Sequence, residues 1–307
     1  MIKLRPLPDN GIIGIMAPSS PIEPVRLEKG VAYFEKRGYR VVVKPSCHTR
    51  DNYLAGSAVD RASELMQLVN DPDVDLIFFA RGGFGSSAML PLLDFNAIKS
   101  ARKLMIGYSD ITALEWGIYA QTGIPSLSTG MPATDFYTDP VHPDFEKAFW
   151  DFMRTGKVDY SLTVPASLSS GEVRGLAMPG TLSVAAKLAG SPYFPDLTNT
   201  IPILEDVGEP RHKTEGYLWQ AKLAGWFEAA SAVMFGSFSP PDEETFDDVP
   251  SMDKVLNRLL KNTKLPVVRD VPYGHIDHKL PFPLGVELSV SFGKTVRITS
   301  TDTIFDS

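Results

Sequence analysis

The fold of this chain is decided by one stretch, Lys103-Leu-Met-Ile-Gly-Tyr-Ser-Asp-Ile-Thr112, which predicts a buried strand, a tight turn and a helix start in succession. The residues from Lys103 to Ile106 form an apolar run with one charge at its edge, and Gly107 permits backbone angles that other residues avoid. Asp110 suits the first turn of a helix. The stretch therefore predicts that Ser109 lies where a strand reaches the edge of a sheet, with a helix N-terminus behind it.

This placement of Ser109 has two interpretations. A Ser on a sharp turn between a strand and a helix is the nucleophile of one group of hydrolases, in which the next backbone N–H binds an oxyanion. A Ser at such a junction is also a common N-cap, which carries no chemistry. The five residues 107–111 end in Ile where the nucleophile pattern has a second Gly, so this stretch alone leaves both interpretations open.

Strands and helices alternate through the first half of the chain. The pattern predicts strands at 12–16, 40–44, 75–80, 103–106 and 124–128, and helices at 26–37, 60–69, 86–93 and from 113 onward. Such alternation is typical of the α/β class, in which a doubly wound parallel sheet carries its chemistry at the carboxyl ends of the strands. Ser109 and the segment Arg81-Gly-Gly-Phe-Gly85 both follow such ends.

The second half of the chain has a different pattern. Prolines and polar residues loosen the alternation between 136 and 170, apart from one amphipathic helix near 145–153. We therefore divide the chain into a nucleophile domain at 1–135, a linker at 136–170 and a second domain at 171–307. For the second domain we expect a β-rich α+β fold, with strands at 201–204, 232–236, 284–292 and 295–300 and helices at 181–188, 215–224 and 252–260.

The composition excludes several classes of protein. A chain with 43% hydrophobic and 22% charged residues is typical of soluble globular proteins, and its net charge of −7 argues against nucleic acid or an anionic membrane as a partner. The apolar run at 11–17 is too short for a signal-peptide core or a membrane span, so we expect a cytoplasmic protein. Cys47 is the single cysteine and the sequence lacks His-Glu-x-x-His, so no disulfide or metal site is expected.

A nucleophilic Ser needs a base and a carboxylate, and the second half offers both. His275 lies in a Pro- and Gly-rich loop between predicted strands, where function concentrates, although a solvated side chain is the more frequent state of a loop histidine. Glu205 directly follows an apolar strand and could orient the imidazole, whereas Asp206 would point to the opposite face and Glu209 lies in a loop. An edge-strand charge or a structural ion pair is the alternative interpretation of Glu205.

The glycines of the 81–85 segment also have two interpretations. They could turn backbone N–H groups toward Ser109 and supply a second oxyanion donor. Glycines that only form a tight turn explain the segment equally well. A Walker or Rossmann phosphate loop fits poorly, because the segment lacks Gly-Lys-Ser/Thr and an acidic ribose ligand in register.

Six segments, taken in order, closely resemble the LD-carboxypeptidase family, the serine peptidases that include muramoyltetrapeptide carboxypeptidase and the microcin-immunity peptidase. Each segment alone is ordinary, but their order is specific and spans nearly the whole chain. They are Ile15-Met-Ala-Pro-Ser-Ser-Pro21, Tyr53-Leu-Ala-Gly56 with Arg61, Ala80-Arg-Gly-Gly-Phe-Gly85, Gly107-Tyr-Ser-Asp-Ile-Thr112, Leu204-Glu-Asp-Val-Gly-Glu-Pro210, and Gly274-His275 with Leu280-Pro-Phe-Pro-Leu-Gly285.

The resemblance implies a fold and a catalytic site. The fold is a Rossmann-like N-terminal domain with a doubly wound parallel sheet, followed by a swivelling, β-rich α+β C-terminal domain, and the assembly is a homodimer. The site is a triad of Ser109, Glu205 and His275, with the backbone N–H groups of Asp110 and Gly83 as the oxyanion hole and with no metal or other cofactor. It lies between the domains, because the nucleophile comes from the first half and its two partners from the second.

The resemblance also implies a function. The leading one is a serine carboxypeptidase that cleaves the L,D amide bond of cytoplasmic murein tetrapeptide and releases a terminal D-amino acid, as in peptidoglycan recycling. Two alternatives stay open, namely a microcin C-type immunity peptidase that cleaves a peptidyl or aminoacyl nucleotide, and a non-catalytic small-molecule-binding protein. Arg81 is a candidate for binding the substrate carboxylate, although its place beside the glycines equally suits a structural role.

Three segments depart from the family pattern, at 127–132, 178–182 and 211–216. All three are expected to shape the pocket, while the triad positions are unchanged. We therefore expect this chain to share the reaction class and to differ in substrate.

Overall fold

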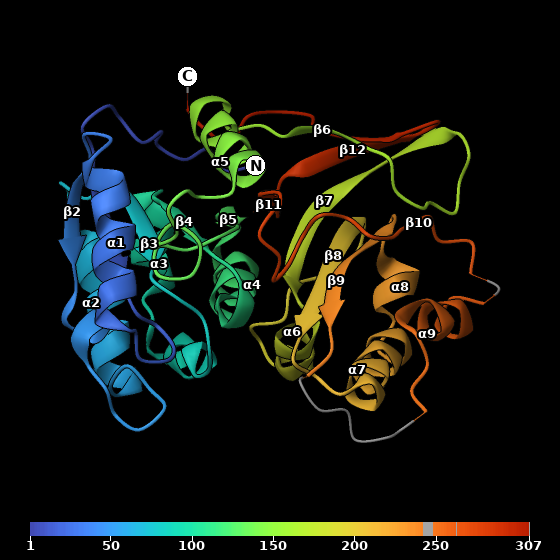
Figure 1. The fold of residues 1–307 in the computed structure, drawn as a ribbon, viewed down its shortest axis with the longest axis horizontal. Coiled ribbons are helices and arrows are strands. Elements are labelled where there is room, and N and C mark those ends of the chain that lie inside the picture. Colours follow the sequence, from blue (N-terminus) through green and yellow to red (C-terminus); the bar gives the residue numbers. More distant parts are fainter. Residues whose placement is uncertain (242–247, 262, 307) are drawn as a thin grey trace.

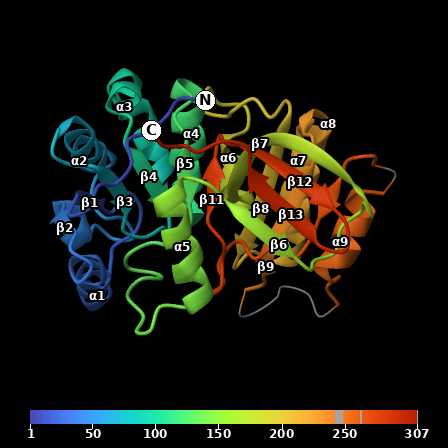
Figure 2. The same cartoon turned by 90° about the horizontal axis from the view of Figure 1, so that it is seen from above.

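The structure of the protein is a computed structural model that describes residues 1–241, 248–261 and 263–306. The chain forms two sheets that lie side by side, and helices pack against both (Figure 1). A view from above shows the same division, with helix α5 (Pro143–Thr155) near the boundary between the sheets (Figure 2). The first half of the chain builds one sheet and most of the second half builds the other.

The first sheet confirms the predicted doubly wound α/β architecture. Its strand order is β11-β5-β4-β3-β1-β2, in which β1 to β5 pair in parallel and β11 pairs antiparallel with β5. Strands β1, β3, β4 and β5 are buried at every residue, as expected for strands covered on both faces. The strands are β1 (Ile12–Met16), β2 (Arg40–Val43), β3 (Leu76–Phe79), β4 (Leu104–Gly107), β5 (Ser126–Ser128) and β11 (Phe282–Leu284).

Helices and short 3₁₀ turns connect these strands. The α-helices are α1 (Pro24–Glu35), α2 (Ala58–Asn70), α3 (Phe95–Ala101) and α4 (Thr112–Thr122), and the 3₁₀ helices are η1 (Pro45–His48), η2 (Ser86–Leu92) and η3 (Ser109–Ile111).

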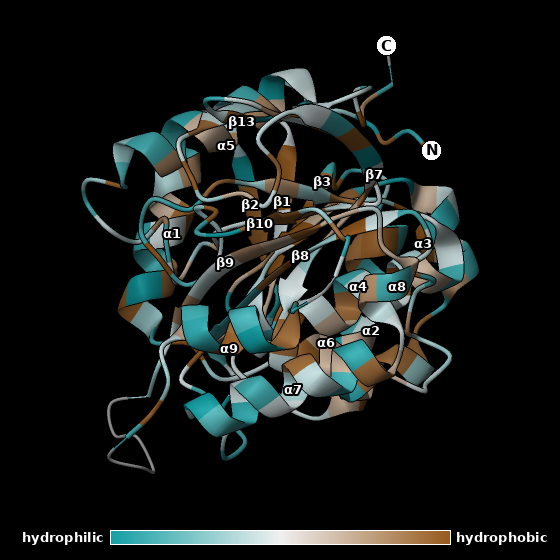
Figure 3. Cartoon of the chain, turned by 90° about the vertical axis from the view of Figure 1, so that its right-hand side faces the viewer, coloured by the Kyte–Doolittle hydropathy of each residue, from teal (hydrophilic) through white to brown (hydrophobic). Residues whose placement is uncertain are grey.

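The second sheet is mixed, with the order β10-β9-β8-β7-β12-β13-β6. Strands β7 to β10 pair in parallel, whereas β12, β13 and β6 continue the sheet antiparallel. Figure 3 shows apolar strands in its interior and hydrophilic outer faces on α7 and α9. The strands are β6 (Asp159–Leu162), β7 (Gly171–Thr181), β8 (Thr200–Val207), β9 (Val233–Ser239), β10 (Val267–Val268), β12 (Glu287–Phe292) and β13 (Val296–Ser300), and the helices are α6 (Leu182–Leu188), α7 (Arg211–Leu223), α8 (Trp226–Ala229) and α9 (Met252–Leu259).

Helix α4 joins the two sheets. The sequence predicts one apolar stripe through Leu114, Ile118 and Tyr119, but the structure buries this helix on nearly every face, because it packs against β5, β7 and α6. The indole Nε1 of Trp116 donates a hydrogen bond to the carbonyl of Pro179 in β7 at 2.8 Å. The turn that carries Ser109 is therefore attached through α4 to the second sheet.

Two predictions of local structure are wrong. The helix expected at 86–93 is the 3₁₀ helix η2, because Pro91 cannot donate a backbone hydrogen bond, and α3 was not predicted. The single strand expected at 284–292 is two strands in different sheets, β11 and β12. Gly285 separates them with a φ of +75°, and a Cβ there would lie 2.2 Å from Cε2 of Tyr119, so only glycine fits where the chain passes α4.

The segment predicted as a linker contains regular structure. It carries α5 and β6, and β6 pairs with β13 at the end of the second sheet. The boundaries at 135 and 171 stay a prediction. Near the two ends of the chain, Leu4 pairs with Phe305. Within the described residues, no helix combines the length and apolar character that crossing a membrane requires.

A close backbone contact places the His275 segment beside β9, and it can be tested with two glycines. A Cβ on Gly236 would lie 2.3 Å from the backbone oxygen of Tyr273, whereas no neighbour among the described residues lies within 4 Å of a Cβ on the helical Gly216. We expect Gly236→Ala to lower the free energy of unfolding by about 1–3 kcal/mol. Gly216→Ala should raise it by about 0.5–1 kcal/mol, because alanine has the higher helix propensity. Urea unfolding measures both, and equal effects of the two substitutions would contradict this packing.

Candidate active site

The Ser109 side chain lies on a strained turn at the end of β4. Its φ is +67°, in the left-handed region that non-glycine residues rarely occupy. Such strain concentrates at functional sites, where the surrounding structure holds it in place. Its hydroxyl forms a hydrogen bond with His275 Nε2 at 3.0 Å, and neither η3 nor α4 has a side-chain cap hydrogen bond. The structure thus favours the nucleophile interpretation of Ser109 over the N-cap interpretation.

His275 lies between Ser109 and Glu205. Its Nδ1 atom is 2.8 Å from Glu205 Oε2, while its Nε2 atom faces the Ser109 hydroxyl. The imidazole is 20% exposed and the Glu205 side chain only 1%, so the imidazole is reachable and the carboxylate is shielded from water. The ring of Tyr108 packs 4.8 Å from the imidazole ring. The structure therefore brings together all three residues that the sequence placed in a triad.

Strand β8 presents two neighbouring carboxylates to opposite faces, as strand alternation predicts. Glu205 faces His275, and its second oxygen, Oε1, accepts a hydrogen bond from the hydroxyl of Thr181. Asp206 faces α6, where it accepts hydrogen bonds from the backbone N–H and the hydroxyl of Ser183 at 2.8 and 3.0 Å. The first is part of the candidate site, and the second holds the N-terminus of α6.

Two glycines are required by close approach to the triad. A Cβ on Gly82 would lie 2.9 Å from the Ser109 hydroxyl oxygen and 3.3 Å from the backbone nitrogen of Asp110. Gly274 has a φ of +116°, and a Cβ there would lie 2.6 Å from Glu205 Oε2. Gly83, at a φ of +119°, follows Gly82 in the loop against Ser109. The backbone at Gly82 therefore lies beside Ser109 and Asp110, and the oxyanion role of Gly83 and Asp110 stays a prediction.

Asp110 lies in the first helical turn after β4, as expected. Its carboxylate accepts hydrogen bonds from the hydroxyl of Ser19 at 2.6 Å and the backbone N–H of Ser86 at 2.9 Å. These partners lie in the loops after β1 and β3. The strand order of the sheet reverses between these two neighbouring strands. Asp110 thus connects the three loops around Ser109.

The buried side chain of Arg61, in α2, connects two of these loops, those after β1 and β3, to the start of its own helix. It is 1% exposed and donates hydrogen bonds to the carbonyls of Pro18, Gly56 and Gly85. The burial of Arg61 could have been predicted from the sequence, because Arg61 lies four residues before Leu65 and therefore on the same, buried face of the helix. Arg61 therefore supports the loops that frame the site.

Arg81 is bound to backbone atoms. Its Nη1 donates to the carbonyl of Pro21 at 2.9 Å and its Nε to the carbonyl of Gly82 at 3.2 Å. Burial, followed by the positive charges of Arg26 and Arg50, lowers the pKa of the guanidinium. These contacts give Arg81 a structural role, and its binding of a substrate carboxylate stays a prediction.

Further contacts hold the His275 segment against the first sheet. The hydroxyls of Tyr273 and Ser128 form a hydrogen bond of 2.8 Å, and β11 extends the first sheet next to β5. Lys279 forms a buried ion pair with Asp135, and the two side chains are only 4% and 9% exposed. These contacts fix the position of His275 relative to Ser109.

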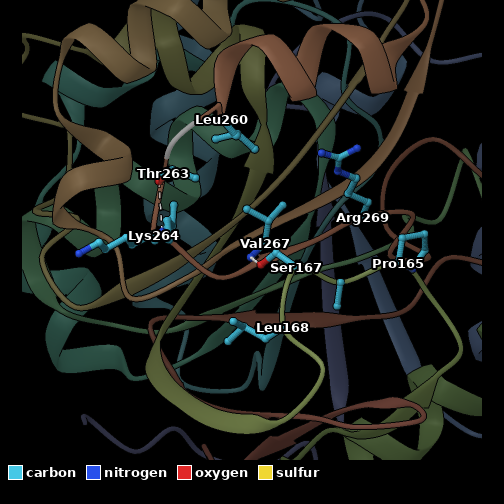
Figure 4. A pocket seen from close by; sticks show the side chains of 10 residues that line it. Pro165, Ser167, Leu168, Leu260, Thr263, Lys264, Val267 and Arg269 are labelled. Carbon is cyan, nitrogen blue, oxygen red and sulfur yellow. Dashed lines mark hydrogen bonds between the residues drawn. The ribbon is translucent and has the colours of Figure 1, made fainter.

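Two other features lie apart from the triad. A cavity of about 580 Å³ opens beside β10, and none of the three triad residues lines it (Figure 4). Its lining consists of Pro165, Ala166, Ser167, Leu168, Leu260, Thr263, Lys264, Leu265, Val267 and Arg269.

Burial raises the pKa of the Cys47 thiol, which contacts the carbonyl of Ile15. Such a thiol is a poor nucleophile.

The buried Asp206 makes stability depend on pH. Burial, and then the charge of Glu205, raise the pKa of the Asp206 carboxyl to about 6, whereas an unfolded Asp titrates near 4. Between about pH 4 and pH 6, the Asp206 carboxyl is therefore protonated more often in the folded state than in the unfolded state. Its contribution to the free energy of unfolding falls as pH rises through this range. The slope is at most about 1.4 kcal/mol per pH unit.

We expect Asp206→Asn to remove this contribution. The stability of the wild type relative to the variant should fall between pH 4 and 6 and then level off, as measured by urea unfolding at a series of pH values. Asp196→Asn is the control, because hydrogen bonds from Thr198 lower the pKa of that exposed carboxyl and move its effect below pH 4. A constant difference between the wild type and Asp206→Asn across the range would show that Asp206 does not titrate there.

The chain is similar to known proteins over most of its length. Residues 13–129 match the LD-carboxypeptidase N-terminal domain, and residues 174–290 match the LD-carboxypeptidase C-terminal domain. The murein tetrapeptide carboxypeptidase of Pseudomonas aeruginosa is 27% identical, over 91% of this chain and 92% of its own. The microcin C7 self-immunity protein MccF of Escherichia coli is 30% identical, over 94% of this chain and 92% of its own.

A solved structure gives the same result. The structure of MccF in complex with glutamyl sulfamoyl guanosine is 25% identical, and the match covers 100% of both chains with a TM-score of 0.90. The two matched domains together account for most of the sequence. This chain therefore belongs to the LD-carboxypeptidase family.

Proposed function

We propose that this protein is a serine carboxypeptidase that cleaves the L,D amide bond of a murein tetrapeptide and releases the terminal D-amino acid. The observation that supports the mechanism most strongly is the pair of contacts made by His275, with Ser109 Oγ at 3.0 Å and Glu205 Oε2 at 2.8 Å. The substrate is supported by the name of the Pseudomonas relative, a murein tetrapeptide carboxypeptidase.

The geometry is suited to acyl transfer through a covalent intermediate. Ser109 Oγ attacks the carbonyl carbon while His275 Nε2 takes its proton, and Glu205 holds Nδ1 and stabilises the resulting imidazolium. The imidazolium returns the proton to the leaving amine, and an acyl ester remains on Ser109. His275 then activates a water molecule, which hydrolyses the ester and frees the serine. The backbone N–H groups of Asp110 and Gly83 are the proposed donors to the oxyanion.

A second substrate class has its own support. MccF is at least as similar in sequence as the murein enzyme, and its solved complex contains an aminoacyl sulfamoyl nucleoside. The alternative function is therefore a microcin-type immunity peptidase that cleaves a peptidyl or aminoacyl nucleotide. Both share the triad chemistry, so the substrate panel below distinguishes them.

The proposed setting follows from the substrate. A murein tetrapeptide available for recycling is a cytoplasmic compound, so we propose a cytoplasmic location and a role in peptidoglycan recycling.

We also propose a homodimer, as the family resemblance implies. Light scattering on the purified protein gives its molar mass in solution, and a value of one chain would exclude the dimer.

The proposed mechanism predicts the effects of substitutions in the triad. Ser109→Ala and His275→Ala should each reduce turnover by roughly a thousandfold or more, because triad members act as a unit. Glu205→Gln should also be severely impaired, since a neutral amide can stabilise the wrong imidazole tautomer. Steady-state rates and labelling by a fluorophosphonate probe measure both effects, and circular dichroism checks that each variant is folded.

Neighbouring carboxylates provide the controls for Glu205. Asp206→Asn and Glu209→Gln should lose much less activity, because Asp206 faces α6 and Glu209 lies beyond the end of β8. Near-normal turnover in Ser109→Ala would exclude a serine mechanism. An equal loss in all three carboxylate variants would remove Glu205 from the triad, and a wild-type protein that does not react with the probe would support the non-catalytic alternative.

The proposed substrate predicts a preference for one stereocentre at the scissile bond. We expect kcat/KM to be higher for a peptide whose L-centre is joined to D-Ala than for the matched peptide ending in L-Ala. A site built for one stereocentre misplaces the carboxylate or side chain of the other, which leaves buried polar groups unpaired and can cost several orders of magnitude. Equal values, or a preference for L-Ala, would exclude the murein assignment. Faster cleavage of an aminoacyl sulfamoyl nucleoside or peptidyl nucleotide would favour the immunity-peptidase alternative.

A further inference from the structure

The Glu205 carboxylate is bound at both oxygens. Oε2 faces His275, and Oε1 accepts a hydrogen bond from the Thr181 hydroxyl. Thr181 is the last residue of β7, and it is the direct register partner of Glu205 in the parallel pairing of β7 with β8. Both residues are buried, with exposures of 4% and 0%. The strand pairing itself therefore places the hydroxyl beside the carboxylate.

Thr181 also contacts the turn that carries Ser109. Its backbone N–H donates to the hydroxyl oxygen of Thr112 at 2.9 Å, and Thr112 is the first residue of α4, three residues after Ser109. This approach depends on Gly180, because a Cβ there would lie 2.7 Å from Cγ2 of Thr112 and 3.0 Å from Nε1 of Trp116. Thr181 thus lies against both the carboxylate and the nucleophile's helix.

These contacts form a closed circuit of hydrogen bonds across the two sheets. It runs through Ser109, His275, Glu205, Thr181 and Thr112, and the 109–112 turn closes it. We propose that Thr181 is a positioning residue, which fixes the rotation of the Glu205 carboxylate and ties it to the turn of the nucleophile. This inference rests on the proposed serine mechanism.

The physical reason is the freedom of a carboxylate group. The terminal torsion of a Glu side chain is broad, so a carboxylate held at one oxygen can rotate away from the imidazole. The Thr181 hydroxyl removes this freedom by holding the second oxygen. Without it, a buried acceptor would lack a partner in the protein and would have to recruit water or turn toward another donor. Either response misaligns the hydrogen bond to Nδ1.

The test compares two substitutions at position 181. Thr181→Val keeps the shape and the backbone N–H but removes the hydroxyl, whereas Thr181→Ser retains the hydroxyl. With a fluorophosphonate probe, we expect Thr181→Val to lower the maximal rate constant for labelling Ser109 by about ten- to a hundredfold, with the half-saturating probe concentration changed less than about threefold. Thr181→Ser should stay within about threefold of the wild type in both.

A matched control separates positioning from packing. Thr122→Val removes a hydroxyl that is also buried, lies in α4 and bonds the backbone carbonyl of Ile118. It should leave the labelling rate within about threefold of the wild type. All variants are measured at a temperature at which circular dichroism shows each of them folded.

The outcomes distinguish this inference from the mechanism on which it rests. Labelling of the wild type but an unchanged rate in Thr181→Val would overturn the role of Thr181 and leave the triad standing. An equal loss in Thr181→Val and Thr181→Ser, or a loss confined to the half-saturating concentration, would also overturn it. A wild type that does not label would overturn both proposals.

Discussion

The hydrogen bonds of His275 link the two sheets, so the whole candidate site depends on how these sheets are held together. Ser109 follows a strand of the first sheet, Glu205 lies in the second, and His275 lies between them in the segment that leads into β11. A rotation of one sheet against the other would separate Ser109 from Glu205. Several independent contacts oppose such a rotation, and they include a buried helix, a strand that the second half of the chain adds to the first sheet, and a buried ion pair. Broad packing of this kind maintains a contact that depends on tenths of an ångström.

Burial shapes the electrostatics of the site. A carboxylate removed from water is stable only when hydrogen bonds or charges replace its hydration. Glu205 has the imidazole and a hydroxyl, whereas Asp206 has the amide and hydroxyl at the start of α6. Adjacent residues on one strand therefore meet the same requirement with different partners, and only one of them faces the nucleophile.

Much of this arrangement could be predicted from sequence, because the signals are local. The apolar run before Gly107 placed Ser109 at a strand end, and strand alternation separated Glu205 from Asp206. The pairing of Glu205 with His275 followed from the family resemblance, since 70 residues separate them and no local pattern joins them. The sequence itself offered only a loop histidine and a strand-end carboxylate, each with an ordinary structural explanation.

The features that sequence analysis did not predict have a common physical cause, which is long-range packing. The sequence predicts the start of α6 within one residue but shows no signal for β7 before it, because this strand alternates poorly and is stabilised by neighbours on both sides. The run at 284–292 looked like one strand, and only the close approach of Tyr119 to Gly285 shows why the chain must turn there. Arg61 carried a readable helical signal, but two of its three carbonyl partners, Pro18 and Gly85, belong to loops that are distant in the sequence.

The position of β11 has a consequence for how the protein is made. Strand β5 can be synthesised and paired with β4 early, but its other edge stays open until residues 282–284 have left the ribosome, about half the chain later. An open edge is a template for mispairing, so the nascent first half is the stage most exposed to aggregation and most dependent on chaperones. The same order of synthesis places the histidine after the serine. Under the proposed mechanism, a growing or truncated chain would therefore hold a nucleophile without its base, and hydrolytic activity would arise only when almost the entire polypeptide is complete.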